Sequence, residues 1–575
     1  MAAGQPKPAF YIVAGVVVVA LIGFALYKGV LTPHAPTNKD GTGGPPLELG
    51  EKAESTDKPK LSATEWKEIH GNKLPEVKGA SKYKPMTDNT VRFAINVWAG
   101  WAPIFLANDG MKPGKVWKGG DGTDFKVELV MDDNPIHMFD AYASGDYHVG
   151  WATLDMVPLF LQRFVDKEGK PKDTRIMPRV YQQIDWSNGG DGIVVRENLK
   201  TVADLRGKKI ALAENSPSHY FALTMLVFGG VQPSEVEFSY YPDAFQAAAA
   251  FNARKELSAC VSWSPDIYNL AKVKGNRMLV TTSQANKLIA DVWFARADFA
   301  KDHPEIMEGL VRGIFDAMQE LKGDAGKKHA AELMAKGYSI ELTDAMDMLN
   351  DAHNTNWAEN HDFFLDPGNS TNFERIWNQS YLVYRRVGNI DHQPVPFNQV
   401  MDFSVIDKLG QEDKYKSQKN EYHVQFTPQT VKETKGAEKP ILTNTIYVKF
   451  APNSWDLYKK VSHEVNGKTV EDLYDPTVDA ALEQIAKLSG QFAAARIVIE
   501  GHSDTSMQGQ VPATLVKELS LNRANAVKEG LLQKYKDLDP NRFAVEGVGW
   551  DRPADEKDQS KNRRVEVTVY TAEKQ

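Results

Sequence analysis

The sequence predicts a multidomain chain with one membrane-spanning helix, a long α/β region and a smaller C-terminal α+β domain. Three observations predict this arrangement. An unbroken apolar run occupies residues 9–27, strand-like and helix-like segments alternate over residues 89–405, and short alternating strands flank two helices within residues 441–575. Two polar segments, 31–88 and 406–440, separate these three parts.

The apolar run at residues 9–27 predicts an uncleaved membrane anchor within residues 1–30. About 19 helical residues span roughly 28 Å, which is close to the thickness of a bilayer core. Lys7 precedes the run and favours an N-terminus inside the cell, although Lys28 follows it. A cleaved signal peptide is the competing interpretation. Its apolar core is shorter and ends at a small-x-small site, whereas here the bulky Tyr27 ends the run.

The two polar segments differ in character. The first part of 31–88 is rich in Pro, Gly, Thr, Lys and Glu and predicts a flexible linker, followed by a partly helical lead-in. The segment 406–440 is dense in Lys, Gln and Glu and predicts a polar connector.

Composition excludes several classes of function. The 575 residues carry a net charge of −8, which gives no basic footprint for nucleic acid. The single cysteine, Cys260, excludes an intramolecular disulfide and leaves too few thiolates for a structural zinc site. Neither GxGxxG nor a P-loop pattern occurs, so we expect no nucleotide cofactor, and no metal is expected.

The C-terminal region carries four recognisable segments, which are IVIEGHSD, LSLNRANAV, VEGVGWDRP and KNRRVEVTV. Around them we expect two helices, at 476–488 and 519–535, and four strands, at 446–450, 496–500, 543–548 and 565–570. Helices on one face of a sheet make an α+β sandwich.

These segments resemble the OmpA-like peptidoglycan-binding domain of bacterial envelopes. The resemblance implies that Asp504 and Arg523 grip the diaminopimelate of the wall stem peptide, with Asn562 and Arg563 beside the site. A carboxylate can pair with the ammonium of diaminopimelate, and a guanidinium can hold its carboxylate with two hydrogen bonds. Ser503 replaces the commoner Thr, and the loop after Asp504 is long. The competing interpretation is a turn-capping Asp and a solvated Arg.

The middle region alternates strands and helices throughout, which predicts an α/β fold with largely parallel sheets. A helix is expected at 139–144. The expected strands lie at 91–97, 125–131, 149–152, 192–196, 209–213, 236–241, 259–263 and 292–296.

The segments VRFAINVWAGWAPIFLAND, MFDAYASGDYHVGWATLDMVP, TVADLRGKKIAL and CVSWSPDIYNLA resemble periplasmic substrate-binding proteins. The most similar group handles nitrate, sulfonates, taurine and thiamine-type pyrimidines. The resemblance implies a two-lobed α/β periplasmic-binding-protein-like domain with a small solute bound between the lobes. We expect the chain to cross between the lobes near 192–195 and 290–294.

The expected solute site is built from side chains that follow strands. We expect Trp98, Trp101, Asp185 and Trp263 to converge there, because loops at the carboxyl ends of strands face the ligand. Abundant Trp and Asp without Arg favour a cationic or flat aromatic ligand. The competing interpretation places each Trp in a core and each Asp at a helix cap. Further candidates in the same loops are Asp133, Asn134, Trp151, Thr153, Asp155, Trp186, Asn188, Asn215, Ser216, Ser218 and Asp266.

Two classes of function remain open from the sequence. In one, an inner-membrane protein attached to peptidoglycan binds or senses a periplasmic solute, with a transporter or another membrane protein as a candidate partner. In the other, the chain is a mechanical tether whose middle domain serves protein interaction. The sequence has neither clustered His residues nor a nucleophile accompanied by a base, so we do not expect an enzyme. An ion-driven stator is disfavoured, because residues 9–27 contain no Asp, Glu, Lys, Arg or His.

Overall fold

The computed structural model describes residues 73–570, except 423, 438–439, 447, 449, 452, 466–467 and 558. The predicted anchor at 9–27 and the linker before residue 73 lie outside these residues. Within the described part of the chain, no helix combines the length and the apolar character needed to cross a membrane.

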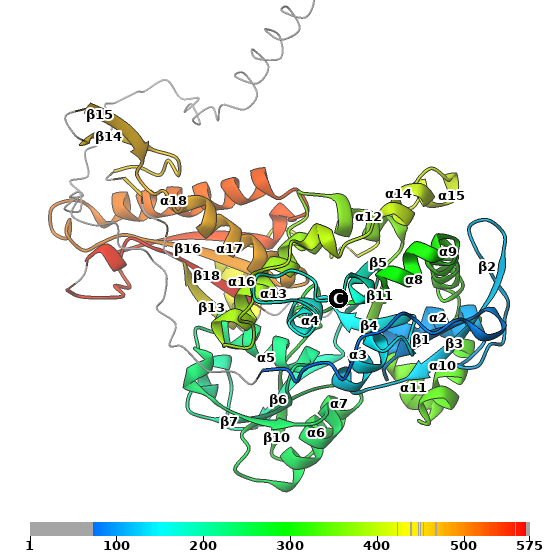
Figure 1. Ribbon diagram of the computed structural model, residues 1–575. Helices are drawn as coiled ribbons and strands as arrows, with labels where there is room; N and C mark the ends of the chain where they lie inside the picture. The colour runs from blue at the N-terminus through cyan, green and yellow to red at the C-terminus, as the bar shows by residue number, and fades with distance from the viewer. Residues whose placement is uncertain are drawn as a thin grey trace, which may run out of the picture. The chain divides into compact units, whose positions relative to one another are not determined.

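The first lobe is built on a seven-stranded sheet with the order β12-β5-β11-β4-β1-β3-β2 (Figure 1). Strand β1 runs parallel to β3 and β4, whereas β11 lies antiparallel between β4 and β5. The bounds are β1 Thr90–Ile95, β2 Trp117–Lys118, β3 Asp124–Met131, β4 Val149–Thr153, β5 Pro178–Ser187, β11 Ala290–Arg296 and β12 Ala352–Asn354.

Amphipathic helices cover this sheet. In α9, Ile306, Leu310 and Ile314 recur at a spacing of four residues and are buried, so one stripe of the helix packs on the lobe. The helices of this lobe are α2 Ala102–Asn108, α3 Pro135–Ala143, α4 Met156–Leu161, α8 Ala297–Asp302, α9 Pro304–Glu320, α10 Asp324–Tyr338, α11 Leu342–Met348, α12 Trp357–Leu365, α13 Phe373–Arg386, α14 Ser404–Leu409 and α15 Asp413–Lys416.

The second lobe has a five-stranded sheet with the order β10-β6-β9-β7-β8. Strand β7 is parallel to β8 and β9, so β7 and β9 end at the same edge of the sheet. Helices α5 Pro217–Phe228, α6 Ala244–Ala253 and α7 Asp266–Lys272 pack on it (Figure 1). The strands are β6 Asp191–Arg196, β7 Lys209–Ala213, β8 Glu237–Tyr241, β9 Ala259–Trp263 and β10 Asn276–Thr281.

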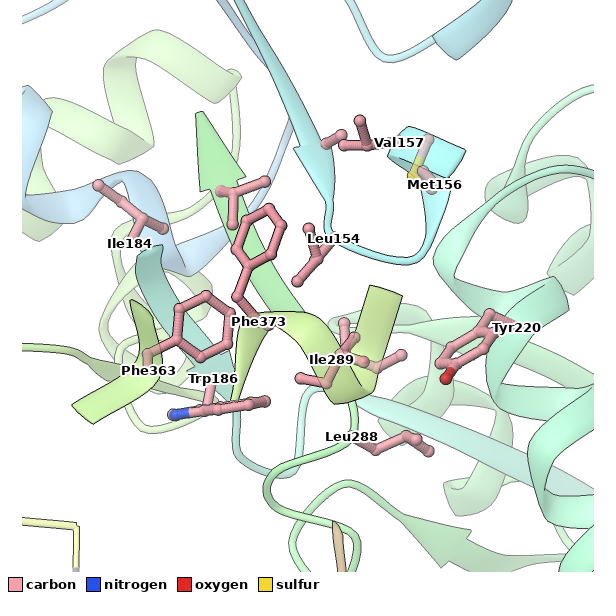
Figure 2. Packing of buried hydrophobic residues seen from close by; sticks show 14 of the residues in the cluster. Leu154, Met156, Val157, Ile184, Trp186, Tyr220, Leu288, Ile289, Phe363 and Phe373 are labelled. Carbon is pink, nitrogen blue, oxygen red and sulfur yellow. The ribbon is translucent and has the colours of Figure 1, made fainter. Parts of the chain in front are cut away.

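The chain crosses between the lobes at residues 188–190 and 282–289. The predicted crossings at 192–195 and 290–294 were therefore placed slightly too late, because those residues already belong to β6 and β11. The second crossing is apolar at its end. Leu288 and Ile289 lie fully buried close to Leu154, Trp186 and Tyr220, so this end of the crossing packs against residues of both lobes (Figure 2).

The C-terminal domain has a four-stranded sheet with the order β13-β18-β16-β17, against which helix α18 packs. The predicted strand at 446–450 is wrong in position, because the edge strand β13 ends at Ile446. The hairpin formed by β14 and β15 was not predicted. The elements are α16 Val431–Ala437, β13 Pro440–Ile446, β14 Lys460–Val465, β15 Lys468–Leu473, α17 Val478–Gln491, β16 Arg496–His502, α18 Ala513–Lys534, β17 Phe543–Gly549 and β18 Val565–Tyr570.

Candidate functional sites

Four buried carboxylates meet where the two lobes join. Asp291, at the start of β11, is the register partner of Thr153 in β4 and of Asp185 in β5, and Asp155 follows β4. Asp191 opens β6 directly after the first crossing. We call Asp155, Asp185, Asp191 and Asp291 the junction carboxylates. Their exposed fractions are 1%, 0%, 3% and 4%, so water does not solvate their charges.

Burial keeps these carboxyl groups protonated to unusually high pH. It raises the pKa of Asp155 to about 7 and the pKa of Asp191 to about 7. Burial also raises the pKa of Asp185 and of Asp291 well above the usual range, and repulsion among the neighbouring carboxylates adds to the effect. Among the described residues, no Lys or Arg forms an ion pair with any junction carboxylate. The site therefore favours positive charge.

Trp98 is held directly against Asp185. The Trp98 Nε1–H donates to both carboxylate oxygens of Asp185, at 3.3 and 3.2 Å. Two glycines make room for this pair. A Cβ at Gly100 would lie 1.5 Å from Asp185 Oδ2, and a Cβ at Gly190 would lie 2.2 Å from the Trp98 ring. A side chain at either position would displace the pair.

Asp191 and Asp155 accept hydrogen bonds of different lengths from neighbouring hydroxyl groups. Ser187 Oγ donates to Asp191 Oδ2 at 2.7 Å. Tyr384 donates to Asp155 Oδ2 at a longer 3.3 Å, and Asp155 Oδ1 is a buried acceptor without a hydrogen-bond partner in the described structure. Such an acceptor costs free energy unless a ligand or a water serves it.

The second lobe contributes a tryptophan, Trp263, and a further aspartate, Asp266, to the junction. Trp263 ends β9 and is the register partner of Asp191, with 8% of its surface exposed and no hydrogen-bond partner for its Nε1–H among the described residues. Asp266 follows at the start of α7, and burial raises its pKa to about 6, with repulsion from Asp243 as a second cause. In the first lobe, repulsion from Asp243 also contributes to raising the pKa of Asp133, after its burial. Carboxylates thus face each other across the lobes.

The predicted solute-site residues divide into two groups. Trp98 and Asp185 are in contact, and Trp263 lies at the same junction through its pairing with Asp191. Trp101 lies instead in the core of the first lobe, where its Nε1–H donates to Asn96 at 2.7 Å. The sequence reasoning missed Asp191 and Asp291. Both begin buried strands next to an expected crossing, which was the available signal.

The predicted wall-binding residues lie in the C-terminal domain, and all are largely buried. Arg563 pairs with Asp504, which also accepts the Ser506 backbone N–H at 3.0 Å. Arg523, 1% exposed, donates instead to the Ser454 carbonyl at 3.1 Å, and its guanidinium stacks over an aromatic ring.

Asn562 supports this site from the adjacent loop. Its Oδ1 accepts the backbone N–H groups of Ala554 and Asp555 at 2.7 and 3.0 Å. Binding of diaminopimelate by Asp504 and Arg523 stays a prediction, and in the structure Asp504 forms its ion pair with Arg563. Asp504 and Arg523 each have polar partners within their own domain.

One other cluster has the composition of a metal site. Glu500, His502 and Glu566 hold three possible ligand atoms within 4.8 Å of one another, the one such group in the described residues. Cations already neutralise it. Arg552 pairs with Glu500 at 2.8 Å, and Arg564 pairs with Glu566 at 2.6 Å. We therefore interpret it as an ion-pair network of the sheet.

Comparison with known proteins divides the chain in the same way. Residues 180–324 match the NMT1/THI5-like family, and residues 469–566 match the OmpA family. The chain is 28% identical over 191 residues to the taurine-binding periplasmic protein of Escherichia coli, covering 32% of this chain and 55% of that protein. It is 35% identical over 114 residues to outer membrane protein Omp38 of Acinetobacter baumannii, covering 19% of this chain and 30% of that protein.

A solved structure of the periplasmic aliphatic sulphonate binding protein SsuA from Escherichia coli is similar at 18% identity, with a TM-score of 0.41. It covers 54% of this chain and 97% of that one. The chain spans about half the length of the taurine-binding relative and under a third of Omp38. The two family matches lie in different parts of the sequence. The protein therefore combines an NMT1/THI5-like substrate-binding domain with a C-terminal OmpA-family domain.

Proposed function

We propose that this chain is a solute-binding or solute-sensing protein of the bacterial periplasm, anchored in the inner membrane through residues 9–27 and attached to peptidoglycan. The observation that carries the proposal is the presence of an NMT1/THI5-like domain and an OmpA-family domain in one chain. A relative matched by the first domain is named as a taurine-binding periplasmic protein, and a relative matched by the second as an outer membrane protein. Both names belong to the envelope of diderm bacteria.

The solute binds, in this proposal, at the junction of the two lobes. Trp98, Asp155, Asp185 and Asp291 come from the first lobe, while Asp191 and Trp263 come from the second. The crossings at 188–190 and 282–289 are the positions where a hinge motion would open and close the site. No catalysis is proposed, and the binding domain passes or reports its solute to a transporter or another membrane protein.

The C-terminal domain attaches to the wall through the stem peptide of peptidoglycan. We propose that Asp504 and Arg523 bind the ammonium and the carboxylate of diaminopimelate. Because Arg563 already pairs with Asp504, the ligand ammonium must share that carboxylate or displace the Arg563 guanidinium from it.

Two measurements test this function. The purified full chain is incubated with sacculi that contain diaminopimelate, and its sedimentation is compared with that in the absence of sacculi. Thermal unfolding is then followed in a panel of small solutes, because a ligand at 100 times its Kd adds about 2.7 kcal/mol to stability. Sedimentation with no stabilisation by any solute favours the tether. A failure to sediment contradicts wall attachment.

A further inference from the structure

We propose that the solute of this protein is an organic cation carrying primary ammonium or guanidinium groups, bound by the junction carboxylates, and that it is not a sulfonate. The inference rests on the proposed solute-binding function and assigns the ligand's chemical class. It departs from the sulfonate and taurine names of the relatives.

The junction of the two lobes is rich in carboxyl groups and has no paired basic side chain among the described residues. Asp155, Asp185, Asp191 and Asp291 lie in one buried group, and Asp351 adds a fifth carboxylate beside Asp191. No basic side chain in the described residues pairs with any of them, whereas Asp140, Asp298 and Asp504 each pair with an Arg. A sulfonate placed here would lie among carboxyl groups, with no Lys or Arg beside them to neutralise its charge. A cation would instead be stabilised by each carboxylate that it ionises.

One carboxylate oxygen of the junction, Asp155 Oδ1, accepts no hydrogen bond from the described residues. Asp155 is 1% exposed, and its Oδ1 lacks a hydrogen-bond partner among the described residues. The Asp155 environment includes Asp191 and Asp291, so this oxygen belongs to the same group of carboxylates. Buried acceptors in proteins are nearly always served by a donor. A ligand N–H at this place supplies a donor and a positive charge together, which a quaternary ammonium cannot do.

The arrangement of the junction carboxylates favours an organic cation over a bare metal ion. A metal site needs several ligand atoms that converge on one point. Within the described residues, three possible ligand atoms converge at Glu500, His502 and Glu566, and not among the junction carboxylates. The four groups come from four different segments, at the end of β4, in β5, at the start of β6 and at the start of β11. Several separate carboxyl groups suit a ligand that carries nitrogen atoms on a carbon framework.

The aromatic residues fit the same ligand. Trp98 is fixed by its hydrogen bond to Asp185, and Trp263 lies opposite Asp191 in the sheet of the second lobe. An indole attracts a cation through its ring face. These two residues therefore offer apolar contact to the carbon framework without repelling its charged ends.

Isothermal titration calorimetry on the detergent-purified full chain tests the inference. The probes are putrescine, agmatine, tetramethylammonium, calcium chloride and sodium ethanesulfonate, at pH 8 and constant ionic strength. We expect putrescine or agmatine to bind. Tetramethylammonium, calcium and ethanesulfonate are expected to give no saturable heat.

Isosteric variants locate the binding. Asp155→Asn and Asp191→Asn resemble the protonated form of each group, so the fold should tolerate them. Each should weaken amine binding roughly tenfold to a hundredfold, because a hydrogen bond to a charged group is lost. Asp344→Asn, on an exposed position of α11, is the matched control and should bind as the unchanged chain does.

The outcomes separate the two proposals. Binding of ethanesulfonate without the amines overturns the cation inference and leaves the solute-binding function in place. Calcium binding, lost in Asp191→Asn, replaces the organic cation with a metal and also overturns the inference. Amine binding that is unchanged in both junction variants places the ligand elsewhere. If no probe binds, the cation inference fails, and the thermal-unfolding panel then decides between another solute and the tether.

Discussion

The Trp98 indole N–H donates to both carboxylate oxygens of Asp185, across 87 positions of sequence. The bond joins the loop after β1 to the end of β5, shortly before the chain crosses into the second lobe. It therefore ties a residue of the solute site to the base of the crossing.

Replacing each of two tryptophans separates a ligand role from a core role. Trp98→Phe removes the donor to Asp185, which costs about 1–2 kcal/mol of stability and weakens amine binding. Trp101→Phe removes the bond to Asn96 and costs a similar amount of stability, but it should leave amine affinity unchanged. Thermal unfolding and calorimetry on both variants check this. Equal losses of affinity would contradict the placement of Trp101 in the core.

The ligand-free protein should lose stability through the junction carboxylates as pH rises. The pKa of Asp191 is about 7 in the folded chain and about 3.9 in an unfolded one, so the folded state binds more protons between these values. The contribution is complete below about pH 4 and is lost as pH rises through about 7. At full ionisation it is on the order of 4 kcal/mol for this group.

Asp191→Asn isolates this effect, because asparagine has no proton to lose. The stability difference between the variant and the unchanged chain should grow from pH 5 to pH 8. The groups around Asp191 are Ser187, Tyr268 and four further carboxyl groups, which are those of Asp155, Asp185, Asp291 and Asp351. Asp344→Asn again serves as the control. A difference that is constant with pH would show that Asp191 is already ionised in the folded protein.

Wall binding should depend on both charges carried over from the OmpA-like resemblance. Asp504→Ala or Arg523→Ala leaves a partner charge unpaired and should cost on the order of 2–5 kcal/mol of binding to sacculi. Asp551→Ala, in an exposed ion pair with Lys517, is the control and should sediment normally. Circular dichroism must show that each variant is folded. Normal sedimentation of the folded Asp504 and Arg523 variants would exclude these residues from the site.

The topology is tested by membrane fractionation with N-terminal sequencing. We expect residues 9–27 to remain attached, with the chain in the membrane fraction and everything after Lys28 accessible from the periplasm. A mature protein that begins near Pro36 and is released by osmotic shock would replace the anchor with a signal peptide.

The sequence predicted strands well where their residues are uniformly apolar or alternate. Strands β16, β17 and β18 were located in this way. Strand β5 was missed, because Gln182, Gln183 and Asp185 interrupt its apolar pattern while being fully buried. Asp185 is one of the junction carboxylates, so the failure of the pattern includes a residue of the candidate site.

The candidate site was only partly predictable for a related reason. Asp185 and Trp98 were chosen because they follow strands, and the structure brings them into contact. Asp191 and Asp291 lie at the starts of strands, and only the antiparallel placement of β11 between β4 and β5 brings Asp291 to the same edge. Pairing between distant strands is not encoded in local periodicity.

The most direct test of the account asks whether one molecule holds the wall and a solute together. Radiolabelled putrescine is added to the full chain bound to diaminopimelate-containing sacculi, and label in the sediment is corrected for sacculi alone. The account predicts label retained in proportion to protein. Asp504→Ala should lose label together with protein, and Asp191→Asn should lose label while protein still sediments. Protein in the sediment with all label in the supernatant, at a concentration well above any calorimetric Kd, would contradict the account.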